Sequence, residues 1–524
     1  MNPRPVRGTA AIIGRRGFLG LVAAGAVLNG TGCGGPCPQP SGGQTARPVP
    51  AFVPASEASA SFSGEGALAA AGDAGPFSIA ALLAAPSFFV AHRGSGDNWP
   101  EHTMLAYTKS AAAGMKALEV SVSSTADGVL VCHHDLNTER LTGADLTIAR
   151  ASYAALESLR NDARGWLGPA APLEPIPRLV DVLRTFLPSR VIFLEDKQGT
   201  NADQLLELLE NYPRARERVV WKQPVSSPGH ALATARGYTT WGYVTTPDYG
   251  NLSGLIPMVD LLGVHHSAPD ATVRELVGSG KPVAAWEVRR RSDHARLKAL
   301  GVRGFICSNI VHVLHLEERR PEDGFETGLR SAGDLPWRSD DAWDGQPAMD
   351  QGAVRLDNED ASSYLMGSMG GLSARNRELA FDLRWPQGLP VGPGRAGVAF
   401  GQDDDAPYGM DMDTEARGYQ LEFGSDGTLS LRRKDRGAGP VVLAEAKGAP
   451  PRAGEWTRLV LSVTPYRVTV RRPNETGGQA AESTDTAYGG GWFSLLKNYD
   501  GGPPVEFRNV TFRQSAAADA CEVR

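Results

Sequence analysis

Residues 87–94 read Ser-Phe-Phe-Val-Ala-His-Arg-Gly, a short apolar run that ends in a histidine and an arginine. Similar β-rich runs follow it, and segments with helical periodicity, such as 203–210 and 272–278, lie between them. The later runs cover residues 116–123, 191–195, 218–222, 238–244, 259–265, 282–288 and 304–307. Continuous apolar strands that alternate with helices are typical of a parallel sheet buried on both faces, and eight such units close a barrel. The sequence therefore predicts an α/β TIM (β/α)8 barrel over residues 77–317.

Polar side chains gather where the first predicted strands end. A hairpin-like extension after the second run, residues 127–135, also ends in polar residues, His133-His134-Asp135. In barrels of this kind the chemistry lies at the C-terminal ends of the strands, so we expect these side chains to share one pocket. They are His92, Arg93, Glu119, Ser121, His134, Asp135, Glu195 and Lys197.

The same residues carry a resemblance to a known family. Its matching pieces are His92-Arg93-Gly94, Pro100-Glu101-His102-Thr103, Gly114, Glu119, Asp127-Gly128, His134-Asp135, Arg140-Leu141-Thr142-Gly143, Ile176-Pro177-Arg178-Leu179, Glu195-Asp196-Lys197 and Trp286. In order and spacing they resemble the glycerophosphodiester phosphodiesterase family. The resemblance implies a barrel fold and metal-assisted hydrolysis of a phosphodiester.

Histidines and cations of this set suit that reaction. Cleaving a phosphodiester requires charge neutralisation, a general base and a general acid. Histidine can perform either proton transfer near neutral pH, so we assign His92 and His134 to this pair without deciding which is the acid. Arg93 and Lys197 are expected to contact phosphate oxygens, Arg93 through its forked guanidinium.

A divalent cation, Ca²⁺ or Mg²⁺, is the expected cofactor, because hard cations bind carboxylate oxygens and polarise a phosphoryl group. Glu119 and Glu195 are the expected ligands. The family usually has Asp two residues after the first glutamate, and here Ser121 stands in that position as a weaker ligand. The site can therefore hold metal weakly, recruit Asp196 or water, or be inactive.

Four further residues are expected to support the site. Asp135 follows the second histidine. Glu101 either contacts the metal or hydrogen-bonds loop amides, and Lys222 ends the fourth run, where it can face the pocket. Trp286 is either barrel packing or an aromatic wall for the substrate. His133 is interpreted as a strand neighbour of His134.

Residues 322–515 show alternating patterns and turn signals, which predict an all-β sandwich. Gly454-Glu455-Trp456-Thr457-Arg458-Leu459 and Val505-Glu506-Phe507-Arg508-Asn509-Val510 resemble parts of concanavalin-like lectin and glucanase jelly rolls. That resemblance implies binding of cell-surface carbohydrate. The acidic run 403–405, with Asp411 and Asp413, is interpreted as a solvated loop or a Ca²⁺ site.

The N-terminus resembles an export signal. Arg15-Arg16 precedes a short apolar run, as in a twin-arginine signal, so residues 1–33 are interpreted as such a signal, with Cys33 a candidate for lipidation. Residues 34–76 are rich in Pro, Gly and Ala and predict a linker. The formal net charge of the 524 residues is -6, and no basic stripe suggests a nucleic-acid partner.

Three functions remain open on these grounds. The first is an exported, metal-dependent phosphodiesterase acting on glycerophosphodiesters or related phospholipid or wall-polymer headgroups. The second is a weakened or inactive barrel that binds surface glycan or phospholipid, an interpretation favoured by Ser121. The third is an enzyme of the phosphatidylinositol phospholipase or sphingomyelinase D type.

Overall fold

The computed structural model describes residues 77–316, 320–327, 348–357, 364–368, 376–406, 408, 417–473 and 478–515. The predicted export signal, linker and Cys33 lie outside these residues, as do Asp411 and Asp413. Within the described part of the chain, no helix is both long enough and apolar enough to cross a membrane.

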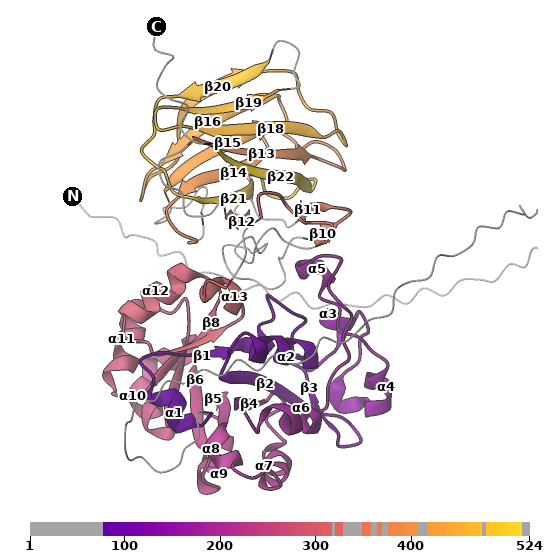
Figure 1. Cartoon of the computed structure of the whole chain (residues 1–524), viewed down its shortest axis with the longest axis vertical. Helices are drawn as coiled ribbons and strands as arrows, with labels where there is room; N and C mark the ends of the chain where they lie inside the picture. Colours follow the sequence, from indigo (N-terminus) through magenta and orange to yellow (C-terminus); the bar gives the residue numbers. More distant parts are fainter. Residues whose placement is uncertain are drawn as a thin grey trace, which may run out of the picture. The chain divides into compact units, whose positions relative to one another are not determined.

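Eight parallel strands form a closed barrel (Figure 1). They are β1 (Phe88–Ala91), β2 (Ala117–Ser124), β4 (Val191–Asp196), β5 (Val219–Pro224), β6 (Thr239–Val244), β7 (Leu261–His265), β8 (Val283–Val288) and β9 (Gly304–Cys307). Strand β1 pairs with both β2 and β9, which closes the ring. A short strand, β3 (Leu130–Cys132), pairs antiparallel with β2. The predicted barrel is confirmed, and each of its eight strands comes from one of the predicted runs.

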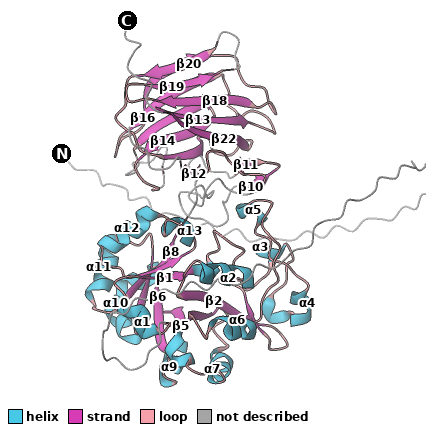
Figure 2. Cartoon of the chain, in the orientation of Figure 1, coloured by secondary structure: helices cyan, strands magenta, loops and turns pink. Residues whose placement is uncertain are grey.

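Helices surround the barrel strands (Figure 2). The α-helices are α1 (Ile79–Ala84), α2 (Met104–Ala112), α3 (Glu139–Thr142), α4 (Tyr153–Glu157), α5 (Arg164–Leu167), α6 (Leu179–Phe186), α7 (Ala202–Glu210), α8 (Ala215–Arg218), α9 (Gly229–Ala235), α10 (Leu252–Leu255), α11 (Asp270–Gly278), α12 (Arg291–Ala299) and α13 (Ile310–Val313). The 3-10 helices are η1 (His92–Gly94), η2 (Ile148–Arg150), η3 (Thr246–Asn251) and η4 (Ile256–Met258). Helix α6 buries residues spaced at i, i+3, i+4 and i+7, which is the pattern of a helix with one apolar face. These residues are Leu179, Val182, Leu183 and Phe186.

The interior of the barrel is polar at the C-terminal ends of the strands and apolar beneath them. Its apolar layer consists of Phe88, Val90, Ala117, Val191, Phe193, Val220, Trp241, Leu261, Ala284 and Ile306, joined by Ile79 and Leu82 of α1. Full burial of one large apolar side chain stabilises the fold by about 1.5–3 kcal/mol. Alternate residues of a strand face the same side, so Phe193 and Glu195 share a face, with Glu195 nearer the C-terminal end. The apolar layer therefore forms the floor beneath the polar strand ends.

The C-terminal region forms two antiparallel sheets. One has the order β10 (Ala348–Asp350), β11 (Ala353–Leu356), β22 (Val505–Ser515), β13 (Asn376–Arg384), β18 (Thr457–Val463), β19 (Val468–Arg472), β20 (Gln479–Ser483). The other has the order β12 (Tyr364–Ser368), β21 (Trp492–Lys497), β14 (Arg395–Gln402), β15 (Gly418–Gly424), β16 (Thr428–Lys434), β17 (Val441–Lys447). Inward residues of both sheets, such as Phe381 and Phe423, share one core. The all-β sandwich is confirmed, whereas its lectin-like character stays a prediction.

Candidate active site

Three charged side chains on adjacent strands form the centre of the site. Glu119 lies on β2, Glu195 on β4 and Lys222 on β5, and the strand register sets Glu195 beside Lys222. The Lys222 ammonium hydrogen-bonds both Glu119 Oε1 and Glu195 Oε2. All three side chains are at most 9% exposed. The structure therefore brings together both glutamates expected to bind metal, and it sets a lysine between them.

The remaining oxygens of these carboxylates also accept hydrogen bonds. The backbone N–H of Arg93 donates to Glu119 Oε2 at 2.7 Å. Lys197 Nζ and the Tyr243 hydroxyl donate to Glu195 Oε1 at 3.1 and 2.9 Å. Ser121 Oγ lies 3.5 Å from Glu195 Oε2, at the limit of a hydrogen bond. Every carboxylate oxygen of the pair thus has a protein donor.

Charge neutralisation keeps the pair ionised despite its burial. Burial alone would raise the pKa of Glu119, but Lys222 and nearby histidine and arginine groups hold that pKa well below its usual range. Burial would also raise the pKa of Glu195, and Lys222 and Lys197 reverse that shift. For Lys222 burial lowers the pKa, whereas the two carboxylates raise it above its ordinary value overall. The centre therefore contains an ammonium ion between two carboxylates at neutral pH.

Glu287 orients His92, which begins η1 directly after β1. The imidazole Nδ1 lies 2.8 Å from Glu287 Oε2 and 2.7 Å from Ser308 Oγ, and Nε2 lies 3.9 Å from Glu119 Oε2. Arg289 Nη2 in turn lies 2.7 Å from Glu287 Oε1. The sequence analysis missed Glu287, although a carboxylate at the C-terminal end of a predicted barrel strand was a usable signal.

Replacing Glu287 with glutamine is expected to lower kcat by roughly 10–100-fold, the range typical of outer residues that orient a functional histidine. The amide can still form a hydrogen bond, but it no longer compensates a charge on the imidazole of His92. A positioning role also predicts a shifted pH profile and an almost unchanged KM. Glu287→Asp should recover part of the rate, and the exposed Glu275→Gln on α11 serves as control. An unchanged pH profile would contradict this role.

His134 lies at the other side of the centre. Its Nδ1 is 2.7 Å from Asp135 Oδ1, and its Nε2 is 3.2 Å from Lys197 Nζ. Burial and the nearby Arg93 and Lys197 cations lower the pKa of His134 to about 4, although the bond to Asp135 opposes this. We place the ring proton on Nδ1, where it is donated to the Asp135 carboxylate, since Nε2 faces an ammonium donor. The ring is then neutral near pH 7, with its lone pair on Nε2.

Glu101 joins both sides of the site through arginines. Its fully buried carboxylate lies 3.1 Å from Arg93 Nη1 and 2.6 Å from Arg140 Nη2. Arg140 Nε lies 2.6 Å from Asp135 Oδ2. The two arginines hold the pKa of Glu101 well below its usual range against the effect of burial. The carboxylate of Glu101 thus binds two guanidinium groups, which the sequence analysis did not predict.

Local backbone geometry explains why the loop around His92 folds this way. Gly94 has a φ of 77°, and a Cβ there would lie 2.8 Å from Ala106 Cβ. Only glycine adopts this conformation and tolerates such a close approach without strain. Helix α2 then begins after Thr103, whose hydroxyl accepts a hydrogen bond from the Ala106 N–H as an N-cap. The loop from His92 to Thr103 is therefore anchored at both ends.

Aromatic rings form the wall next to the charged centre. Trp286 is half-buried, and its ring centroid lies 5.1 Å from that of Tyr243 and 6.2 Å from that of Trp241. Lys222 Nζ lies 5.6 Å from the Trp241 centroid and 5.5 Å from the Tyr243 centroid. Trp286 thus packs inside the barrel near the C-terminal ends of the strands, beside the Trp241 and Tyr243 rings that flank the Lys222 ammonium.

Other histidines and acids lie in separate environments. His133 is buried and its Nε2 lies 3.2 Å from the Asn137 carbonyl. His265 hydrogen-bonds Ser267, with its ring 4.3 Å from that of His266. Asp405 hydrogen-bonds His312 at 2.8 Å. The structure does not bring these side chains into the charged centre.

The donor set does not match a divalent cation in this arrangement. Glu119, Glu195 and Ser121 lie close together, but the ammonium of Lys222 stands between the carboxylates. Ca²⁺ takes six to eight oxygen ligands and Mg²⁺ requires a nearly ideal octahedron. Over the described ranges, no group of three or more His, Cys, Asp or Glu side chains could hold a metal ion.

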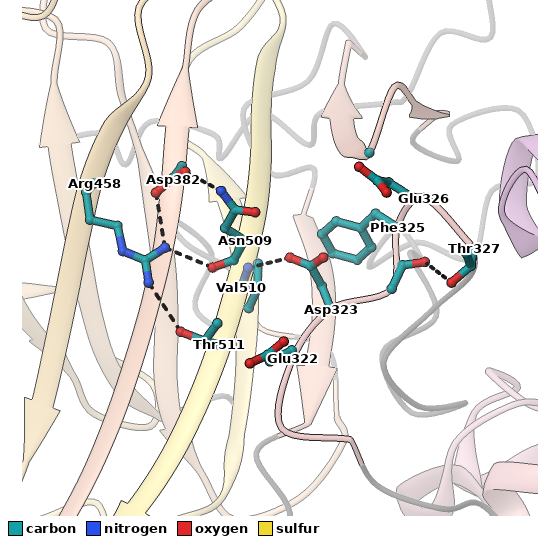
Figure 3. A pocket seen from close by; sticks show the side chains of 12 residues that line it. Glu322, Asp323, Phe325, Glu326, Thr327, Asp382, Arg458, Asn509, Val510 and Thr511 are labelled. Atoms are coloured by element: carbon teal, nitrogen blue, oxygen red, sulfur yellow. Dashed lines mark hydrogen bonds and ion pairs between the residues drawn. The ribbon is translucent and has the colours of Figure 1, made fainter.

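A separate cavity of about 640 Å³ lies in the sandwich (Figure 3). Arg458 hydrogen-bonds Asp382, the Asn509 carbonyl and Thr511 there. Asn509 also donates to Asp382, and Asp323 accepts the Val510 N–H. The Asp323 bond ties residues 320–327 to β22, and the other bonds join β13, β18 and β22 to one another. The cavity contains none of the residues that the sequence predicts for catalysis.

Comparisons with known proteins found a family model and relatives similar in sequence to this chain. A sequence model described as the glycerophosphoryl diester phosphodiesterase family matches residues 92–221. A Bacillus subtilis protein named as a glycerophosphodiester phosphodiesterase, YhdW, is 25% identical over 232 residues, which cover 42% of this chain and 93% of that relative. A Mycobacterium tuberculosis protein named as glycerophosphodiester phosphodiesterase 1 is 41% identical over 83 residues, or 16% of this chain and 30% of the relative. The chain thus spans nearly all of one relative and under a third of the other.

Solved structures show a weaker likeness. A phosphodiesterase from Oleispira antarctica, in complex with the product sn-glycerol-3-phosphate, gives a TM-score of 0.38 at 21% identity, covering 42% of this chain and 92% of that chain. A TM-score this low carries no argument. The fold rests on the strand pairing described above, and the relationship rests on the sequence matches.

Proposed function

We propose that this chain, whose residues 92–221 match the glycerophosphoryl diester phosphodiesterase family model, hydrolyses glycerophosphodiesters with His92 and His134 as the proton-transfer pair. One observation carries the proposal. Each imidazole is bonded through Nδ1 to a carboxylate, Glu287 or Asp135. A continuous chain of contacts through Lys197, Glu195, Lys222 and Glu119 connects the two rings.

The geometry suggests which histidine is the base. His134 is neutral and carries its lone pair on Nε2, so it can accept a proton from the attacking water. Its neighbour Lys197 donates to that nitrogen in the free site, and we expect it to turn to the phosphate when substrate binds. A protonated His92 could donate at Nδ1 to Glu287 and present Nε2–H beside Glu119, which suits a general acid.

The reaction then balances without any further reagent. The water oxygen bonds to phosphorus while His134 takes a water proton. The bond from phosphorus to the leaving oxygen breaks, and His92 protonates that oxygen to release an alcohol. Arg93 and Lys197 are the proposed contacts to the phosphate oxygens. We assign no step to the divalent ion that the sequence predicts, because Lys222 lies between its two expected ligands.

Release of glycerol phosphate tests this function directly. The full chain is assayed on glycerophosphodiesters of choline, ethanolamine, inositol and glycerol. It is also assayed on intact phospholipids. We expect turnover of at least one glycerophosphodiester. Turnover of phospholipid alone would favour the phospholipase-type alternative. Binding of these compounds with no hydrolysis of any would favour the non-catalytic alternative.

The pH profile of kcat/KM is expected to stay on its plateau well below the ordinary histidine pKa of about 6.5. His134 must be neutral to act as the base, and its pKa is lowered to about 4 in the free enzyme. Activity should therefore fall only as the pH drops through about 4, where His134 gains a proton. Circular dichroism at each pH separates this effect from unfolding. A loss of kcat/KM toward acid pH that is centred near pH 6.5 would contradict the assignment of His134 as the base.

Export and glycan binding are further proposals that rest on sequence patterns alone. Arg15-Arg16 and the apolar run after it support export by a twin-arginine signal, with lipidation of Cys33 as an open alternative. Cell fractionation of an Arg15→Lys/Arg16→Lys variant tests export, because unchanged localisation would refute it. Retention of the full chain on insoluble polysaccharides tests whether the sandwich binds carbohydrate.

A further inference from the structure

Lys222 lies between two carboxylates that were expected to hold a divalent cation. Its ammonium hydrogen-bonds one oxygen from Glu119 and one from Glu195, the two residues that the family resemblance implies as metal ligands. Lys222 is 103 residues from Glu119 in sequence, and the closed barrel brings them together. The third expected ligand, Ser121, contributes only a hydroxyl in place of a carboxylate.

No carboxylate oxygen of this pair remains without a donor. Arg93 N–H holds the second oxygen of Glu119, and Lys197 and Tyr243 hold the second oxygen of Glu195. A divalent ion would have to break the Lys222 bonds to reach either glutamate. It would also place two positive charges next to a buried ammonium, and such like charges repel strongly where water is excluded.

The aromatic wall around Lys222 also suits an ammonium better than a metal ion. Its Nζ lies 5.6 and 5.5 Å from the ring centroids of Trp241 and Tyr243. Ring faces attract an organic cation at such distances. They supply none of the six to eight oxygen ligands that a hard cation takes. Two carboxylates and two rings therefore form an enclosure around one ammonium group.

We propose that Lys222 supplies the permanent positive charge of this site, so that the chain hydrolyses phosphodiesters without a divalent metal ion. This inference deepens the proposed function and rests on it for the reaction. The bond changes are the same as those given above, and no further reagent is needed. The lysine provides fixed charge beside the phosphoryl group, a contribution that other enzymes obtain from metal or arginine clamps.

Metal binding can be measured independently of activity. The full chain is treated with chelator, dialysed, and titrated with CaCl₂ and MgCl₂ in a calorimeter. We expect no heat of cation binding at the Glu119/Glu195 site up to millimolar Ca²⁺ or Mg²⁺. We also expect hydrolysis rates that chelator, Ca²⁺ and Mg²⁺ leave unchanged. Binding of one cation per chain that the Glu195→Gln variant loses, or loss of activity in chelator with recovery on adding Ca²⁺ or Mg²⁺, would overturn the proposal.

Two variants distinguish a functional charge from a structural one. Lys222→Met is expected to lose about 10²–10³-fold in kcat, the range for removing one preorganised electrostatic contact. Ser121→Asp/Lys222→Met is expected to gain a Ca²⁺ or Mg²⁺ site that the wild type lacks, because three carboxylates then meet without the ammonium between them. Failure of a soluble, folded double variant to bind either ion would count against the proposal. If the variants do not fold, the wild-type titration decides alone.

The same experiments keep this inference separate from the proposed function. A wild-type chain that hydrolyses none of the substrates refutes the proposed function. The calorimetric titration still decides whether Lys222 excludes the cation. Conversely, a wild-type chain that is active only with added Ca²⁺ or Mg²⁺ supports the phosphodiesterase function and refutes the role of Lys222.

Discussion

Replacing His134 with alanine is expected to lower kcat/KM for a glycerophosphodiester by about 10²–10⁴-fold, the usual contribution of a positioned general base. His92→Ala is expected to do the same, since each ring serves a different proton transfer. The effect on the double variant should be far from additive, because neither transfer is useful without the other. Initial rates of glycerol phosphate release, measured at saturating and limiting substrate, check this expectation.

The control for these variants is His294→Ala. His294 is partly buried on α12, where its ring packs against Phe89 and Phe305 rather than against the charged centre. We expect its kcat to match that of the wild type. A folded His134→Ala chain that keeps more than a tenth of wild-type activity would contradict the proposed pair, and the base would then have to be sought elsewhere.

Replacing Glu101 with glutamine is expected to destabilise the barrel by about 3–5 kcal/mol, because breaking a buried ion pair leaves uncompensated charge. Its carboxylate is fully buried between Arg93 and Arg140, and glutamine would leave both cations without this partner. Since the pKa of Glu101 lies well below its usual range, the stabilisation is present at neutral pH. It is lost as the pH falls through the folded-state pKa.

Urea unfolding of the full chain measures this effect. The chain contains a barrel and a sandwich, so two transitions can occur and a two-state fit applies to each only if they separate. Glu101→Gln should shift the barrel transition alone. The exposed Glu157→Gln on α4 is the matched control and should change stability by no more than about 0.5 kcal/mol. A shift below about 1 kcal/mol for Glu101→Gln would mean that the arginines find other partners.

Strand positions were predictable because the signal is local. The run from Phe88 to Ala91 is apolar and bounded by turn residues and helix signals, and the same holds for the later runs. Burial on both faces requires such continuous apolar segments, whatever the rest of the chain does. Polar residues at the end of a run, such as Glu195, or directly after one, such as His92, then identified the C-terminal face. This much needed no tertiary information, because parallel strands in a barrel end on the same side.

Partners across the barrel were not predictable in the same way. The position of Glu287 at the end of a predicted strand was a usable signal for the site, but no spacing in the sequence links it to His92. Glu101 was expected to contact metal or amides, and the two arginines that it binds were not predicted. Lys222 was expected only to face the pocket, and its position between Glu119 and Glu195 depends on strand register and on side-chain rotamers.

The sequence by itself determined the barrel, the sandwich and the set of charged residues at the strand ends, since these follow from local apolar periodicity and from where each run stops. Only the tertiary structure decided which charges meet. Ring closure brings β1 between β2 and β9, and the strand register aligns Glu195 with Lys222. Whether a site holds a metal ion or an ammonium depends on distances of a few ångströms between side chains from different strands, and no local pattern encodes those distances.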